Sequence, residues 1–294
     1  MKKVLVLGGT QFFGKKAVEL MLEKEWLVTI ATRGNKAHPF GDRVDHIQLD
    51  ARDNEHVGWR AVQSQKWDAV FHNVCYTKED AELAIEKFSK ITGQLYYTSS
   101  LATYSGEKDG YKESDFDPFN YKIDPTIEVD YGEGKRQAET VFFKEAPFNV
   151  TAFRFPIVLD EDDYTKRLHY YVERGLKEEP IAFTNMDYKI NFVKGSTAAE
   201  SIVWAIENEK SGIYNVSSKD AIPLKTLMEW IEDSIKKELQ INETGEPESD
   251  SPFSIPYHWY LHSDKIEKEG FILQNSAEWM KPLIKTIAAQ YLKE

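Results

Sequence analysis

The stretch KVLVLGGTQFFG, residues 3–14, decides the fold of this chain. Val4–Leu7 is a short apolar run that predicts a buried strand, and Gly8 and Gly9 end it. A helix is expected over Gly14–Lys24, where apolar residues recur at helical spacing. Glycines between a strand and a helix let the backbone turn tightly and approach a pyrophosphate, which the free N–H groups at the helix start then bind.

The glycine spacing is that of a dinucleotide-binding loop with one glycine missing. Gly8 and Gly14 fit the pattern G-x-x-G-x-x-G, and Gln11 stands at the middle position. An ordinary glycine-containing turn is the alternative, but the place after the first strand of a βαβ pattern favours nucleotide binding. We expect one set of loop residues to hold the cofactor phosphates: Gly8, Thr10, Gln11, Phe12, Phe13 and Gly14.

Strands and helices alternate along the rest of the chain. Further strands are expected over 28–32, 46–50, 69–74, 95–98, 150–155, 191–193 and 213–216, and helices over 77–92, 131–144, 197–207, 224–239 and 276–291. Thr77 with Asp80, and Thr197 with Glu200, have the spacing of capping boxes. The alternation predicts the α/β class: a Rossmann doubly wound parallel sheet with helices on both faces, plus a small C-terminal α/β substrate lobe.

The domain organisation follows from where this pattern becomes irregular. We expect an NAD(P)-binding Rossmann domain over 1–155, to which 190–216 returns, and a small substrate lobe over 156–189 and 217–294. The polar, proline-containing segment 241–256 is expected to be a loop.

The end of the second strand bears on the choice of cofactor. It runs into Thr32, Arg33 and Gly34, without the acid that binds the ribose 2′-OH of NAD. Arg33 could pair with a 2′-phosphate, so NADP is expected and NAD is the alternative; a solvated arginine is the other interpretation. Asp50 is placed to accept a hydrogen bond from the adenine amino group. Three further cofactor contacts are expected, at Ala51, Asn73 and Lys135.

Three residues form the candidate catalytic site. Tyr131 and Lys135 are four residues apart, which puts both side chains on one face of a helix. The ammonium of Lys135 would stabilise the phenolate of Tyr131, which could then exchange a proton with a substrate oxygen. Ser99 and Ser100 end a strand, and a serine hydroxyl there, assigned to Ser100 by the resemblance given below, could polarise the same oxygen. Tyr104 and Lys108 also match Y-x-x-x-K, but they lie in a loop-like run where the two side chains need not face each other.

Composition limits the other function classes. The formal net charge of -12 disfavours general binding to nucleic acid. No apolar run approaches the length of a membrane span, and a single cysteine, Cys75, fits a reducing compartment, so we expect a cytoplasmic protein, monomer or homodimer, with a small-molecule substrate. No metal is expected: His258 and His262 have helical spacing but lack an acidic or cysteine partner, and the acid run 160–163 is typical of a solvated loop.

These motifs carry a resemblance to a known family. The loop 8–14, the strand bearing Ser100 four residues before Tyr104, and the helix of Tyr131 and Lys135 resemble the extended and atypical short-chain dehydrogenases/reductases, the NAD-dependent epimerase/dehydratase group. Within it, Gly-Gly-Thr-x-Phe-x-Gly resembles the chloroplast stem-loop-binding proteins and their bacterial relatives.

The resemblance implies an NAD(P)-dependent oxidoreductase, or a redox-assisted epimerase or dehydratase. Its substrate would carry a hydroxyl or carbonyl group, with a sugar nucleotide as one candidate. Tyr131 would be the acid/base, Ser100 would orient the substrate, and Lys135 would bind the ribose. A non-catalytic, nucleotide-dependent regulatory protein of the RNA-binding type is the alternative.

Overall fold

The computed structural model describes residues 1–244 and 251–292, which divide into two compact units. Unit 1 consists of Met1–Ser105, Glu113–Phe155 and Ser196–Asn215. Unit 2 consists of Gly106–Lys112, Pro156–Gly195 and Val216–Glu294. The short segment Gly106–Lys112 therefore belongs with the C-terminal part of the chain.

Unit 1 is built on one parallel sheet of seven strands in the order β3-β2-β1-β4-β5-β6-β11. The strands are β1 (Lys3–Leu7), β2 (Leu27–Thr32), β3 (Asp45–Gln48), β4 (Ala69–His72), β5 (Gln94–Ser100), β6 (Asn149–Phe155) and β11 (Gly212–Asn215). The chain runs outward from β1 in one direction and then, from β4, in the other. This is the doubly wound order, so the predicted fold class is confirmed.

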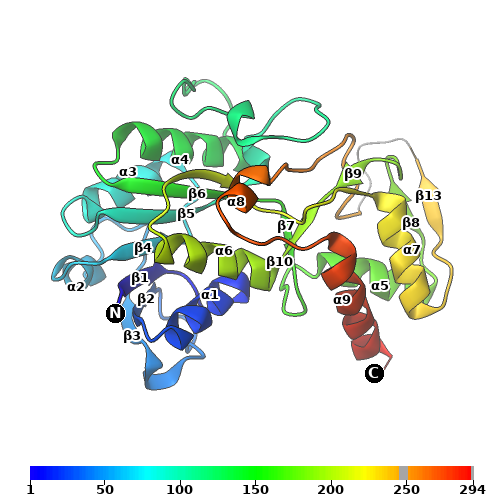
Figure 1. The fold of residues 1–294 in the computed structure, drawn as a ribbon, viewed down its shortest axis with the longest axis horizontal. Helices are drawn as coiled ribbons and strands as arrows, with labels where there is room; N and C mark the ends of the chain where they lie inside the picture. The colour runs from blue at the N-terminus through cyan, green and yellow to red at the C-terminus, as the bar shows by residue number, and fades with distance from the viewer. Residues whose placement is uncertain (245–250, 293–294) are drawn as a thin grey trace. The chain divides into compact units, whose positions relative to one another are not determined.

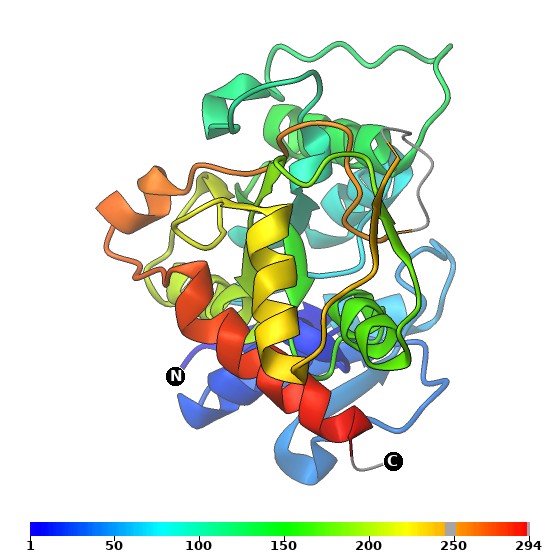
Figure 2. The same ribbon diagram turned by 90° about the vertical axis from the view of Figure 1, so that its right-hand side faces the viewer.

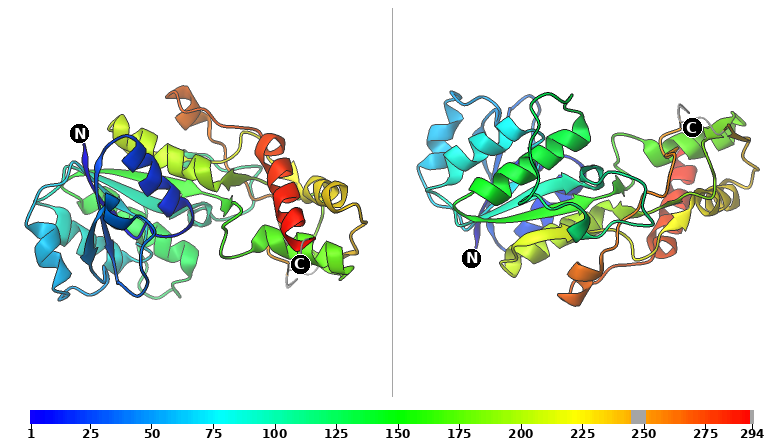
Figure 3. Two further views of the ribbon diagram at one scale, coloured as in Figure 1. Left: turned by 90° about the horizontal axis from the view of Figure 1, so that it is seen from below. Right: turned by 90° about the horizontal axis from the view of Figure 1, so that it is seen from above.

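Helices cover both faces of this sheet (Figure 1). One face carries α1 (Phe12–Glu23) and α6 (Gly195–Glu207), and the other carries α3 (Lys78–Phe88) and α4 (Tyr131–Glu145). The two views of Figure 3 show each pair from its own side. Residues Val4–Leu7 of the interior strand β1 are accordingly all apolar and have no exposed surface. Short helices complete the unit: α2 (Gly58–Gln63) and the 3-10 turns η1 (Gly41–Arg43), η2 (Leu101–Thr103) and η3 (Glu113–Asp115).

One of the two predicted capping boxes forms. The Thr77 side chain accepts a hydrogen bond from the backbone of Asp80, whose carboxylate accepts from Thr77 in return, at the start of α3. The second prediction was wrong. Helix α6 follows β10 (Phe192–Lys194) directly and begins at Gly195, so Thr197 lies inside the helix.

Unit 2 has a core of its own, formed by three helices and short strand pairs. Helices α5 (Arg167–Lys177), α7 (Leu224–Ile235) and α9 (Ser276–Tyr291) lie side by side (Figure 2). Around them, β7 (Ile157–Leu159) pairs with β10, β8 (Ile181–Phe183) with β13 (Ile241–Glu243), and β9 (Lys189–Ile190) with β12 (Ile222–Pro223). Helix α8 (Asp264–Lys268) completes the unit.

Strand β13 corrects part of the loop predicted over 241–256, while residues 245–250 of that segment lie outside the described residues. Within the described ranges, no helix is long and apolar enough to cross a membrane.

Candidate active site

The carboxyl ends of β1, β4 and β5 meet at one edge of the unit 1 sheet. The amide of Asn73 donates to Leu7 O (3.1 Å), and Thr98 Oγ1 donates to Asn73 Oδ1 (2.9 Å). The amide of Gly8 donates to Ala31 O of β2 (3.1 Å). The point where strand order reverses, between β1 and β4, is where doubly wound sheets bind ligands.

The backbone of the glycine loop explains why glutamine is tolerated at its middle position. Gly8 and Gly9 have φ values of +93° and +81°, which favour glycine. Gln11 has φ -139° and ψ 156°, an extended conformation open to any residue. The left-handed position is taken by Phe12 instead, at φ +52°.

Gly14 lets the start of α1 pack against the end of β4. A Cβ atom at this position would lie 2.7 Å from Asn73 Nδ2 and 3.1 Å from the Gly9 Cα. The other two predicted loop residues, Thr10 and Phe13, are half-buried, and the Phe13 ring contacts that of Phe155. The loop thus brings the N-terminus of α1 to the sheet edge, and the residue where the helix comes nearest to that edge, Gly14, has no side chain. This arrangement fits a dinucleotide phosphate.

The predicted adenosine-side residues lie at the ends of β2 and β3. Arg33 is exposed, and its carbonyl accepts from Gln48 Nε2 (3.2 Å). Asp50 and Ala51 are half-buried, and Asp50 Oδ1 accepts from the amide of Arg52 (3.1 Å). No aspartate or glutamate follows β2 directly, as the sequence indicated.

Helix α4 begins at Tyr131 and is capped by Asp130, whose Oδ1 accepts from the amide of Glu133 (2.7 Å). Gly132 and Gly134 lie inside the helix, although glycine disfavours helices. Their positions require glycine.

A Cβ on Gly132 would lie 2.5 Å from Ala102 O, and one on Gly134 would lie 2.6 Å from Tyr76 O. The helix therefore packs directly on the turn after Ser100 and on the segment after β4.

Lys135 is buried at the sheet edge, with 1% of its surface exposed. Its ammonium donates to Cys75 O (2.6 Å) and Thr98 O (2.7 Å). It lies 4.5 Å from the ring centroid of Tyr76 and 5.8 Å from that of Tyr131. Burial lowers the pKa of Lys135 from 10.5 to about 8. The structure therefore brings Lys135 and Tyr131 together, and Tyr131 is 54% exposed at the mouth of this arrangement.

The two serines at the end of β5 have different surroundings. Ser99 is buried and its hydroxyl donates to Glu139 Oε1. Ser100 is half-buried, and its Oγ accepts from the amide of Ala102 (3.1 Å). Successive strand residues point to opposite faces of the sheet, so the Ser100 hydroxyl lies on the other face from Ser99 and its partner Glu139.

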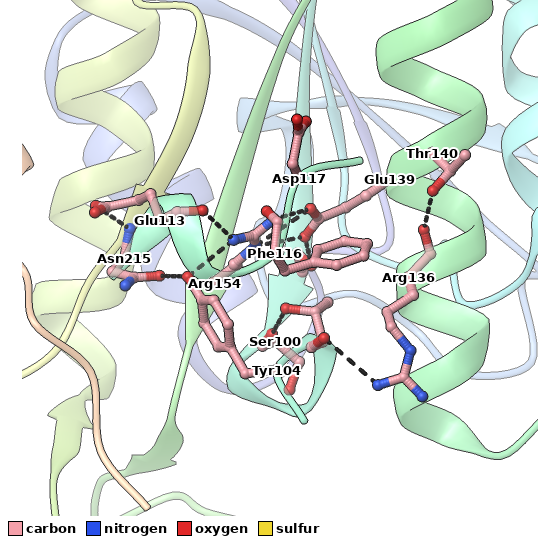
Figure 4. A network of polar contacts seen from close by, with 12 residues as sticks. Ser100, Tyr104, Glu113, Phe116, Asp117, Arg136, Glu139, Thr140, Arg154 and Asn215 are labelled. Carbon is pink, nitrogen blue, oxygen red and sulfur yellow. Dashed lines mark hydrogen bonds and ion pairs between the residues drawn. The ribbon is translucent and has the colours of Figure 1, made fainter. Parts of the chain in front are cut away.

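Sequence reasoning missed a fully buried ion pair beneath this site, which Figure 4 shows. Arg154 Nη2 lies 2.6 Å from Glu139 Oε2, and both side chains have no exposed surface. The guanidinium also donates to Tyr104 OH (2.8 Å), Glu113 O (3.0 Å) and Phe116 O (3.1 Å). Burial alone would lower the pKa of Arg154, but Glu139 outweighs it and the pKa is raised. The pair ties α4, β6 and the segment over 104–116 together.

Tyr104, from the second Y-x-x-x-K match, belongs to this network. Its hydroxyl donates to Asn215 Oδ1 (2.6 Å), and burial raises its pKa. Cys75 is also fully buried, and burial raises the pKa of its thiol. Both side chains are buried and their pKa values are raised, so neither has the properties of a reactive acid, base or nucleophile.

Two features of unit 2 were also considered from the sequence. The acid run is not simply solvated, because Asp160 and Asp163 are 7% and 4% exposed. His258 Nδ1 accepts from the amide of Lys189 (3.0 Å). In the part of the chain that the structure describes, no group of three or more histidines, cysteines or acids could hold a metal ion.

Comparisons with known proteins agree with this fold. No protein-family model matches the chain. It is 23% identical, over 234 residues, to the chloroplast stem-loop binding protein of 41 kDa b from Arabidopsis thaliana; the match covers 74% of this chain and 59% of that protein.

The similar solved structures include the UDP-glucose 4-epimerase of Thermotoga maritima with UDP-glucose (TM-score 0.74, 17% identity, 99% of this chain and 98% of that one). They also include the UDP-glucuronic acid 4-epimerase of Bacillus cereus with NAD (TM-score 0.73, 14% identity, 99% and 100%). The Thermus thermophilus UDP-glucose 4-epimerase with NAD has a TM-score of 0.71 at 17% identity, covering 98% of each chain. The chain has the fold that these sugar-nucleotide epimerases share.

Proposed function

We propose that this chain is an NAD(P)-dependent enzyme of the epimerase/dehydratase or reductase kind. The observation that carries the proposal is the buried ammonium of Lys135, held by two backbone carbonyls at the ends of β4 and β5, next to the exposed Tyr131. A buried ammonium is costly to desolvate, and groups with pKa values shifted in this way cluster at functional sites. The fold neighbours that act on UDP-sugars make a sugar nucleotide the first substrate class to test.

The cofactor would lie across the carboxyl edge of the unit 1 sheet. Its pyrophosphate would bind the loop from Gly8 through Thr10, Gln11, Phe12 and Phe13 to Gly14. Arg33, Asp50 and Ala51 would contact the adenosine end, and Asn73 and Lys135 the nicotinamide ribose end. When bound, the nicotinamide supplies hydride transfer to or from a substrate carbon.

Tyr131 would move the matching proton. Its hydroxyl donates a proton to a substrate carbonyl oxygen, or its phenolate takes one from a substrate hydroxyl. Lys135 favours the phenolate through its positive charge, and Ser100 Oγ holds the reacting oxygen by a hydrogen bond. Because α4 packs closely on the turn after Ser100, the three groups belong to neighbouring elements of unit 1.

Replacement of Tyr131 by phenylalanine tests this role. Tyr131→Phe removes only the phenolic oxygen and should leave Lys135 and its carbonyl partners in place. Turnover, followed by nicotinamide absorbance or by product analysis for a redox-neutral epimerisation, should fall by roughly 10²–10⁴-fold, the usual contribution of a positioned acid or base. Cofactor affinity should change little.

The control for this experiment is Tyr170→Phe, which removes the hydroxyl of a half-buried tyrosine on α5 while keeping its ring contacts. That variant should retain full turnover. Full activity of Tyr131→Phe on a confirmed substrate would show that another group transfers the proton.

A second candidate function is binding of structured RNA, which the similarity to a stem-loop binding protein favours. The net charge of -12 weighs against it, because phosphate contacts dominate RNA affinity. Titration of the protein with a labelled RNA stem-loop distinguishes the two. Salt-dependent binding that is unchanged in Tyr131→Phe, with no turnover on any carbonyl or sugar-nucleotide substrate, would favour the second function.

A further inference from the structure

A cluster of titratable side chains outside the catalytic site lies at the end of β2. His46 Nε2 is 2.8 Å from Thr32 Oγ1, and the rings of His46 and His38 have centroids 5.1 Å apart. His38 Nδ1 is buried and, among residues 1–244 and 251–292, has no hydrogen-bond partner. Arg33 follows Thr32 directly and is exposed.

The position of this cluster in the fold indicates which ligand group it could bind. Thr32 is the last residue of β2, where NAD-dependent Rossmann proteins carry the acid that binds the ribose 2′-OH. Here the neighbouring strand supplies a base instead. Strand β3 pairs with β2 so that His46 lies opposite Ile30, and the imidazole reaches forward to the Thr32 hydroxyl. That hydroxyl also accepts from the amide of Gly34 (3.3 Å), so its position is fixed.

We propose that His38, His46 and Arg33 form a subsite for the 2′-phosphate of NADP, and that the preference for NADP over NAD therefore strengthens as pH falls toward 6.5. This inference rests on the proposed nicotinamide-dinucleotide function. Arg33 supplies a permanent charge. The imidazole of His46 supplies a charge that depends on proton uptake, because histidine titrates near neutral pH.

The direction of the pH effect follows from the charges around His46. Burial and the charge of His38 lower the pKa of His46, so the free protein disfavours its protonation. A phosphate dianion beside the pair would reverse this, and NADP binding would take up protons. Asp45 is the nearby anion, but as the strand neighbour of His46 it points to the opposite face of β3. The other charged side chains between Thr32 and His46 are three exposed cations, Arg33, Lys36 and Arg43, and one exposed acid, Asp42.

Measurement of the ratio of the NADH and NADPH dissociation constants at pH 6.5 and pH 8.5 tests the inference. Protein-induced nicotinamide fluorescence gives both constants, and NADH, which lacks the phosphate, cancels pH effects elsewhere in the site. The ratio should favour NADPH about five- to tenfold more at pH 6.5, the scale of one or two partly exposed charge-assisted contacts. Much of the change should fall above pH 6, where the phosphate monoester itself remains mostly dianionic.

Two variants separate the imidazoles from the arginine. The double variant His38→Asn/His46→Asn should make the ratio independent of pH. Arg33→Ala should reduce NADPH binding at both pH values and keep the pH dependence. Calorimetry in two buffers of different ionisation enthalpy should show proton uptake with NADPH that the double variant lacks.

Three results would overturn the inference. A wild-type ratio that changes less than twofold between pH 6.5 and 8.5 is one. A pH dependence that survives in the double variant is another, because it would assign the effect to other groups. If neither dinucleotide binds at all, the proposed function fails and the subsite fails with it; if both bind with a constant ratio, only the subsite fails.

Discussion

At the scale of single residues, Lys135 has the clearest physical signature. Its pKa in the folded protein is about 8, against an ordinary value of 10.5, because burial disfavours the charged form. Between these two values the unfolded chain binds more protons than the native state. The contribution of Lys135 to stability must therefore rise with pH from about 8 to about 10.5 and stay flat below about pH 8.

A comparison of the wild type with Lys135→Met isolates this term. The free energy of unfolding by urea should increase for the wild type relative to the variant as pH is raised from 8 toward 10. A difference that stays constant or decreases over this range would mean that Lys135 is not desolvated in the native protein.

The loop residues show what sequence can and cannot give at this scale. The pattern of Gly8 and Gly14 was enough to predict a phosphate loop, but Gln11 looked like a defect. The structure removes the difficulty, since the residue with positive φ is Phe12 and Gln11 is extended. A glycine spacing pattern does not say which residue of the loop takes the left-handed conformation. Here that residue is Phe12 and not Gln11, so the missing glycine is not needed.

At the scale of elements, the contact between α4 and the segment after β4 sets the position of the helix that carries Tyr131 and Lys135. A Gly→Ala change inside a helix usually stabilises it by about 0.5–1 kcal/mol. Gly134→Ala should instead destabilise the protein by about 1–3 kcal/mol and reduce turnover, because the new methyl group would lie 2.6 Å from Tyr76 O.

Gly93→Ala is the matched control for this change, since an added Cβ there meets nothing within 4 Å. Chemical denaturation gives both stabilities. Equal effects of the two substitutions would contradict the close approach of α4.

The buried pair of Glu139 and Arg154 makes a second prediction about elements. Glu139→Gln leaves a guanidinium with no exposed surface and no counter-charge, which should cost about 3–5 kcal/mol of unfolding free energy. Glu145→Gln, on the exposed face of the same helix, should change stability by less than about 0.5 kcal/mol. Thermal unfolding of the two variants checks this. If Glu139→Gln left the free energy of unfolding unchanged, the pair would not be what holds α4 to β6.

Elements with a clear period or a capping signal could be predicted from the sequence, and the others could not. The strands of unit 1 and the helices α3, α4 and α9 follow apolar patterns bounded by turn residues. Helix α5 was missed although its buried residues recur at helical spacing, because it lies between Lys166 and Glu178, both in left-handed conformations, with no cap residue or glycine to mark either end. The pairing of Glu139 with Arg154 was missed because it depends on packing of a helix against a strand.

At the scale of the whole molecule, the doubly wound order explains why the predicted site residues share one edge. Parallel strands deliver their carboxyl ends to the same side, so residues as distant in sequence as Gly8, Asn73 and Thr98 meet there. The sequence could not indicate that Gly106–Lys112 joins unit 2. That assignment depends on Tyr111, whose amide donates to Tyr260 O (2.9 Å) across a long sequence separation.

The central claim is that the edge of this sheet binds a nicotinamide dinucleotide, and thermal unfolding of the wild-type protein tests it most directly. A ligand that binds only the folded state at a concentration of about 100 times its dissociation constant adds about 2.7 kcal/mol of stability. For a protein of this size, the melting temperature should then rise by roughly 5–10 °C with millimolar NADP(H) or NAD(H). No rise with any of the four dinucleotides at that concentration would contradict the account.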